Sequence, residues 1–108
     1  DTLRRIIASG GKVVAGTDSP IIPPGISLHT EIQNFVEGGL TPFQALQTAT
    51  VWAAEALGAG EDLGTIEPGK LADLVIIKGD PLSDIRATWN IHTVIKNGET
   101  YPLDDLLR

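Results

Sequence analysis

The chain has 108 residues, enough for one domain with a modest hydrophobic core. Its formal net charge of −6 argues against a nucleic-acid-binding protein, because eight Lys and Arg residues are scattered among fourteen Asp and Glu residues. The absence of cysteine excludes disulfides and cysteine-ligated metal sites, and no apolar run approaches the ~20 residues of a membrane-spanning helix.

The beginning of the sequence has the pattern of a parallel α/β unit. Residues 1–11 are predicted to form a short helix, because a glycine pair follows one apolar face made of Leu3, Ile6 and Ile7. The segment 12–15 is short, and after Lys12 it is apolar and contains two valines. This pattern predicts a buried strand. Three prolines make residues 20–25 an irregular loop.

Two helices are predicted next. Residues 28–37 carry apolar side chains at helical spacing. Thr41-Pro42-Phe43-Gln44 is a helix start, since threonine can cap, proline suits the first helical position and glutamine completes a capping box. This second helix is expected to run to about residue 57, with a break near residues 48–50.

From about residue 62 the pattern changes to strands. Pro68-Gly69 favours a tight turn with positive φ at the glycine, and residues 71–77 are predicted to form a strand. Residues 93–101 are predicted to form a hairpin with a type I′ turn at Asn97-Gly98. An α/β part over residues 1–61 is thus expected to precede a β-rich part over residues 62–108.

The segment Gly16-Thr17-Asp18-Ser19 follows the predicted strand at its carboxyl end. In parallel α/β folds, ligands and catalytic groups gather at that end. Asp18 is therefore a candidate catalytic residue. The alternative is a turn aspartate whose carboxylate binds the neighbouring backbone.

Two further residues are candidates for substrate binding. Ser19 stands next to Asp18, and His29 follows the proline-rich loop at the start of a predicted helix. His29 has no His-x-His or His-Glu-x-x-His partner, so the spacing indicates no metal site. The alternative for His29 is a helix-start histidine bonded to backbone or solvent. Asp73 is interpreted as a carboxylate that stabilises a turn or strand end, and Trp89 as a packing residue.

Three ordered stretches resemble the amidohydrolase superfamily, in particular its imidazolonepropionase-like and prolidase-like branch. The first is Val14-Ala15-Gly16-Thr17-Asp18-Ser19, which resembles the end of the eighth barrel strand. The second runs from Gly38 to Gly58. The third begins at Gly64-Thr65-Ile66-Glu67-Pro68-Gly69-Lys70 and extends to Asn97-Gly98.

This resemblance implies a (β/α)₈ barrel with one or two divalent metals, zinc foremost, and a small β-sandwich beside it. Residues 1–61 would be the last helix–strand portion of the barrel with its closing helices, and residues 62–108 would be the C-terminal sandwich strands. The implied reaction is hydrolysis of a C–N bond in a small-molecule or peptide-like substrate by a metal-activated water. Asp18 would act as general base and, with ligands absent from this chain, as a metal ligand.

The remaining family ligands are missing from this sequence. It has only two histidines and no His-x-His pair, contains no methionine and opens inside a predicted helix. We therefore expect a piece of a longer polypeptide that is inactive alone and binds no metal by itself. The alternative is a non-catalytic folded module that self-associates through exposed strand edges.

Overall fold

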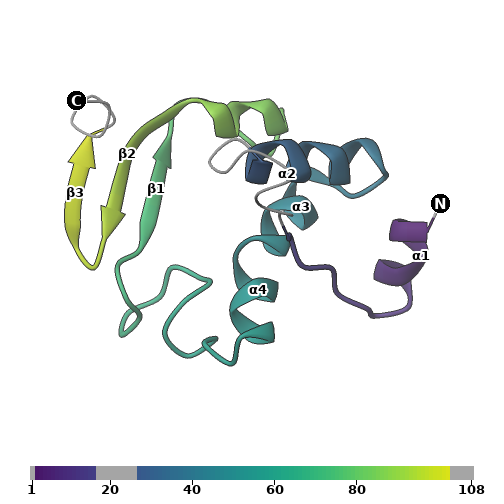
Figure 1. Cartoon of the computed structure of the whole chain (residues 1–108), viewed down its shortest axis with the longest axis horizontal. Helices are drawn as coiled ribbons and strands as arrows, with labels where there is room; N and C mark the ends of the chain where they lie inside the picture. Colours follow the sequence, from purple (N-terminus) through teal and green to yellow (C-terminus); the bar gives the residue numbers. More distant parts are fainter. Residues whose placement is uncertain (1, 17–26, 103–108) are drawn as a thin grey trace.

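The computed structural model describes residues 2–16 and 27–102. It is an α/β fold in which helices precede a small antiparallel sheet. In Figure 1 the three strands lie side by side at one end of the molecule and α1 (Thr2–Ala8) lies at the other. No helix within the described ranges is long and apolar enough to cross a membrane.

Three helices between these ends follow the predicted boundaries closely. They are α2 (Ser27–Glu37), α3 (Pro42–Thr48) and α4 (Val51–Ala56). The capping box at the start of α3 is confirmed, because the Thr41 hydroxyl accepts from the Gln44 N–H while the Gln44 side chain accepts from the Thr41 N–H. The break predicted near residues 48–50 is also confirmed, since it separates α3 from α4.

The strand predicted over residues 12–15 is not formed. A strand needs a neighbouring strand to receive its backbone hydrogen bonds, and none of the described strands pairs with this segment. Instead, the Ala15 N–H at the end of this segment donates a hydrogen bond to α3, to the Thr48 carbonyl oxygen at 2.9 Å.

The sheet contains β1 (Leu74–Ile77), β2 (Ile91–Lys96) and β3 (Glu99–Pro102), all antiparallel and in that order. The type I′ turn predicted between β2 and β3 is confirmed by φ angles of 51° at Asn97 and 83° at Gly98. β1 begins later than residue 71 because the Leu71 N–H donates to the Asp62 carbonyl oxygen, outside the sheet. A short 3₁₀ helix, η1 (Ile85–Trp89), precedes β2 and was not predicted.

The core joins the helices to the segment that leads into the sheet. Ile32 of α2, Ala45 of α3 and Ile85 of η1 are buried against one another. Partly buried apolar side chains surround them: Phe35, Val36, Leu46 and Ala49. Figure 1 shows η1, in green, beside α2. The core therefore fixes α2 relative to η1, and both elements carry residues of the candidate site.

Candidate functional site

Asp18 and Ser19, the predicted catalytic and substrate-binding residues, lie outside the described residues. The described chain reaches Gly16, two positions before Asp18. The Gly16 N–H donates a 2.9 Å hydrogen bond to the Glu31 Oε1 atom of α2. The chain is thus bound to a helix at the last described residue before the segment that contains the predicted general base.

A second hydrogen bond fixes the residue before Gly16. Thr48 is the last residue of α3, so its carbonyl oxygen has no partner within the helix. This carbonyl accepts the 2.9 Å hydrogen bond from the Ala15 N–H. Thr48 is fully buried, and its hydroxyl donates to the Ala45 carbonyl oxygen at 2.6 Å. Two consecutive N–H groups, those of Ala15 and Gly16, are therefore held by α3 and α2.

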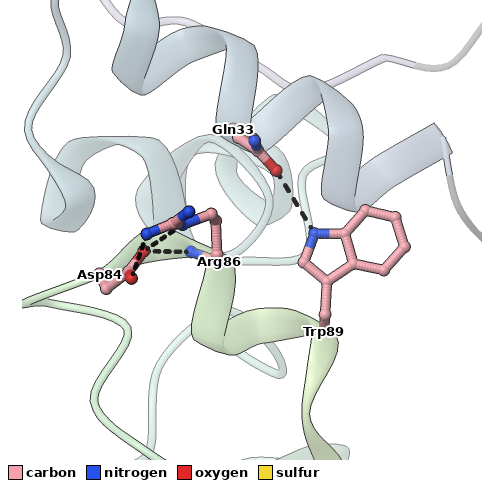
Figure 2. Close-up of polar contacts among 4 residues, drawn as sticks. All are labelled: Gln33, Asp84, Arg86 and Trp89. Atoms are coloured by element: carbon pink, nitrogen blue, oxygen red, sulfur yellow. Dashed lines mark hydrogen bonds and ion pairs between the residues drawn. The ribbon is translucent and has the colours of Figure 1, made fainter.

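His29 contacts η1. Its Nδ1 atom lies 3.2 Å from the Thr88 Oγ1 atom, and its ring lies on that of Trp89, with centroids 5.1 Å apart and planes at 31°. The Trp89 indole N–H donates to the Gln33 Oε1 atom at 3.4 Å (Figure 2). His29 and Gln33 are four residues apart and so share one face of α2. The proposed contact of His29 with substrate stays a prediction.

The start of η1 is stabilised by Asp84. Its carboxylate accepts hydrogen bonds from the Arg86 backbone N–H at 3.0 Å, from Nε at 3.1 Å and from a terminal guanidinium nitrogen at 3.0 Å (Figure 2). The guanidinium hydrogen bonds, followed by the backbone one, lower the pKa of Asp84, and the same ion pair raises the pKa of Arg86. Both side chains are exposed, so the pair is not part of a buried reaction site. It stabilises the N-terminus of η1.

The described residues do not by themselves form a metal centre. Within residues 2–16 and 27–102, no three His, Asp or Glu side chains are grouped so that they could hold a metal ion. The two histidines have separate surroundings, since His29 contacts η1 whereas the His92 ring contacts the hydroxyl of the adjacent Thr93 in β2. The zinc implied by the resemblance therefore does not fit this set of residues on its own.

Sequence reasoning missed Glu31 and the partners of His29. In the sequence, neither the spacing of Glu31 nor its neighbours distinguish it from other helical glutamates. Its role depends on a contact with Gly16, fifteen residues away. One signal for η1 was present, because Asp84 is a residue type favoured at helix N-termini and caps this 3₁₀ helix.

Comparison with known proteins gives consistent matches along the chain. Residues 1–101 match the Amidohydrolase family. The chain is 37% identical over 101 residues to the imidazolonepropionase of Geobacillus kaustophilus, a match covering 89% of this chain and 24% of that protein. It is 36% identical over 94 residues to the imidazolonepropionase of Thermoplasma volcanium, covering 86% and 23%.

Solved structures agree with the sequence matches. A Xaa-Pro dipeptidase with bound methionine in the active site superposes with a TM-score of 0.84 and 39% identity, covering 94% of this chain and 25% of that one. A putative prolidase from Bifidobacterium longum gives a TM-score of 0.82 and 31% identity, covering 92% and 25%. The chain spans about a quarter of the length of these relatives. The resemblance inferred from the sequence is confirmed, and the chain belongs to the amidohydrolase family.

Proposed function

We propose that this chain is the C-terminal portion of a metal-dependent hydrolase that cleaves a carbon–nitrogen bond, with Asp18 as general base. The observation that carries the proposal is the family match over residues 1–101, which runs through the Asp18 segment and both halves of the chain. In this proposal residues 1–61 are the last helix–strand portion of a (β/α)₈ barrel. Residues 62–108 supply the C-terminal strands of a β-sandwich.

Asp18 has the chemistry that such a reaction requires. When water attacks a carbonyl carbon bonded to nitrogen, the water must lose a proton and the departing nitrogen must gain one. A carboxylate placed beside both atoms can accept the first proton and donate it to the second. General acid–base catalysis of this kind contributes about 10²–10⁴-fold to the rate.

The metal requires residues beyond those described. Catalytic zinc sites use about three protein ligands, and the described residues hold no group of three that could serve. The proposal therefore gives this chain at most one ligand, Asp18, and no metal site of its own. We expect the 108-residue chain alone to have no hydrolase activity, with or without added zinc.

The substrate class is taken from the relatives. Imidazolonepropionases and a Xaa-Pro dipeptidase are among the most similar proteins. These names favour a small cyclic or dipeptide-like molecule as substrate.

A hybrid enzyme tests the proposal. The segment of Geobacillus kaustophilus imidazolonepropionase that this chain matches is replaced with this chain, and the hybrid is assayed for imidazolonepropionase and Xaa-Pro dipeptidase activity. We expect turnover by the hybrid and none by the 108-residue chain alone. Turnover by the isolated chain that chelation removes and zinc restores would contradict its predicted inactivity. A folded hybrid that hydrolyses neither class would contradict the proposed function.

A second candidate is a non-catalytic module that associates with a copy of itself. The observation that favours it is the sheet, in which β1 and β3 are both edge strands within the described residues. β1 also exposes Val75 and Ile76, which are 52% and 47% accessible. Unpaired edges with apolar side chains favour pairing with another chain. Light scattering across a concentration series tests this, and a monomer at every concentration would contradict it.

A further inference from the structure

We propose that Asn97 is a site of spontaneous covalent modification, in which its side-chain amide is converted to a carboxylate. The contacts of the hairpin turn with Ala72 and Asp73 keep this reaction slow while the sheet is closed. A chain whose sheet has opened is thereby marked permanently. The proposal concerns the sheet alone and does not rest on the hydrolase reaction.

The sequence around Asn97 supplies the reacting groups. Asparagine is a thermolabile residue, and the atom that attacks its side chain is the backbone nitrogen of the following residue. The sequence has three asparagines, of which Asn97 precedes glycine while Asn34 and Asn90 precede bulky residues that hinder the attack. Asn97 and Gly98 are also exposed to water. Asn97-Gly98 is therefore the reactive pair.

The reaction needs water and no other reagent. The Gly98 nitrogen loses its proton and attacks the Asn97 Cγ atom, forming a new C–N bond. The bond from Cγ to the amide nitrogen breaks, and that nitrogen takes a proton and leaves as ammonia. Water then opens the resulting succinimide ring. Attack at Cγ gives aspartate, whereas attack at the backbone carbonyl carbon gives isoaspartate, and in both cases the Gly98 nitrogen regains its proton.

Two hydrogen bonds oppose the first step. The Gly98 N–H donates to the Ala72 carbonyl oxygen at 3.0 Å, so the proton that must be lost is already bound. The Asn97 N–H donates to the Asp73 Oδ1 atom at 2.8 Å, a bond strengthened by the charge of the carboxylate. In Figure 1 the turn between β2 and β3 lies at the same end of the sheet as the start of β1. The segment before β1 therefore holds both N–H groups of the turn.

The conformation of the turn opposes ring closure as well. The φ angles of 51° at Asn97 and 83° at Gly98 are those of a type I′ turn. The first central residue of such a turn has ψ of about +30°, which places the Gly98 nitrogen almost opposite the Asn97 Cβ atom. Closing the ring requires rotation about this bond, and the rotation breaks the turn. Modification therefore follows local opening of the sheet.

Neither product fits the closed turn. Aspartate at position 97 brings a second negative charge beside the Asp73 carboxylate, and neighbouring like charges are destabilising. Isoaspartate adds a methylene carbon to the main chain inside a turn whose length fixes the pairing of Lys96 with Glu99. The modified hairpin is therefore less stable than the original, and opening leaves a lasting mark.

The first test measures the rate of conversion at Asn97 in the full 108-residue chain at mildly alkaline pH, with and without denaturing urea. Peptide mass spectrometry with chromatographic separation counts aspartate and isoaspartate at this position. We expect conversion in the folded parent to be slower than in urea by about tenfold or more, because the reaction requires opening. Asn97→Gly, which tolerates positive φ and lacks the amide, is the matched control and should release no ammonia from this position.

Two variants test the role of the carboxylate. Folded Asp73→Ala should convert about fivefold faster than the parent, because one hydrogen bond of the turn is lost. Asp73→Asn keeps an acceptor oxygen and should convert at a rate closer to that of the parent. Circular dichroism shows which variants retain the fold. If Asp73→Ala does not, hydrogen exchange at the Gly98 amide of the parent takes its place, and we expect this amide to be protected.

Four results would overturn the proposal. Absence of conversion at Asn97 in urea would show that it is not a modification site. Equal rates in the folded parent and in urea, or a Gly98 amide that exchanges like an unstructured peptide, would show that the turn does not control the reaction. A folded Asp73→Ala variant that converts at the parent rate would remove Asp73 from the account.

The second test asks whether the mark is lasting. Chains converted in urea are refolded by dilution, and the isoaspartate form is separated and unfolded again with urea. We expect its unfolding midpoint to lie below that of the unmodified chain carried through the same steps. Equal midpoints would show that the modified hairpin closes as well as the original, which would contradict a permanent mark on the sheet.

Discussion

The Asn97 N–H donates a 2.8 Å hydrogen bond to the Asp73 Oδ1 atom, which joins the hairpin turn to the residue that precedes β1. The next N–H, that of Gly98, donates to the Ala72 carbonyl oxygen at 3.0 Å. Both central residues of the turn are therefore bound to the chain entering the neighbouring strand. Asp73 thus acts as the stabiliser of a strand end, as interpreted from the sequence.

Replacing Asp73 should weaken the sheet. Asp73→Ala removes the acceptor for the Asn97 N–H and is expected to lower the free energy of unfolding by about 1 kcal/mol. Asp73→Asn keeps an acceptor oxygen and should lose less. Urea denaturation of the three proteins measures the difference, and an Asp73→Ala variant as stable as the parent would refute this role.

The capping box of α3 gives a second stability prediction. Thr41→Ala leaves the Gln44 N–H without its side-chain acceptor, so the free energy of unfolding should fall by about 1 kcal/mol. Thr41→Ser retains the hydroxyl and should stay close to the parent. Thermal denaturation followed by circular dichroism compares them. Identical midpoints for the alanine and serine variants would argue against the cap.

The contact between His29 and Trp89 should be visible by NMR. Because the two rings lie with centroids 5.1 Å apart, the indole ring current should shift the His29 imidazole proton resonances. Trp89→Ala should abolish this shift, whereas Trp89→Phe should retain a smaller one. Loss of the ring contact should also cost about 1 kcal/mol of stability.

Unchanged His29 resonances in the Trp89→Ala variant would contradict the ring contact. If His29 imidazole resonances keep the same positions in the parent and in a folded Trp89→Ala variant, the rings do not stack in solution. His92 is the internal reference, because its ring contacts Thr93 rather than an aromatic side chain.

Asp84 should titrate below its ordinary pKa of 3.8, because Arg86 donates hydrogen bonds to its carboxylate. A pKa lowered in the folded state stabilises the fold above the unfolded pKa. That contribution is lost as the pH falls through the folded pKa. Since the pair is exposed, added salt should raise the pKa of Asp84 toward its ordinary value.

Carboxyl carbon NMR measures this titration. The Arg86→Ala variant should return the pKa of Asp84 toward 3.8, since it removes the guanidinium while leaving the backbone N–H in place. A wild-type Asp84 that titrates at or above 3.8 would show that the ion pair is absent in solution.

Features held by local hydrogen bonds could be predicted from the sequence. The capping box involves residues three positions apart, and the type I′ turn depends on the positive φ that Asn97 and Gly98 tolerate. In both cases the residues that determine the local structure lie within a few positions of one another in the sequence. The same holds for the break between α3 and α4, which falls where two threonines flank Ala49.

Features that depend on distant partners could not be predicted. Residues 12–15 have the composition of a strand, but a strand forms only where a second one pairs with it, and no described strand does. Glu31 resembles any surface glutamate until the fold brings Gly16 to it. For the same reason, the position of His29 beside Thr88 could not be derived from a lone histidine at a helix start.

The measurement that tests the proposed function most directly is kcat of the hybrid enzyme with Asp18→Asn. The account predicts a fall of about 10²–10⁴-fold, because asparagine cannot accept or return the proton. Asp73→Asn, a matched change just before β1, should leave kcat within twofold of the unmodified hybrid. If Asp18→Asn retains the kcat of the unmodified hybrid, Asp18 is not the general base and the central claim is wrong.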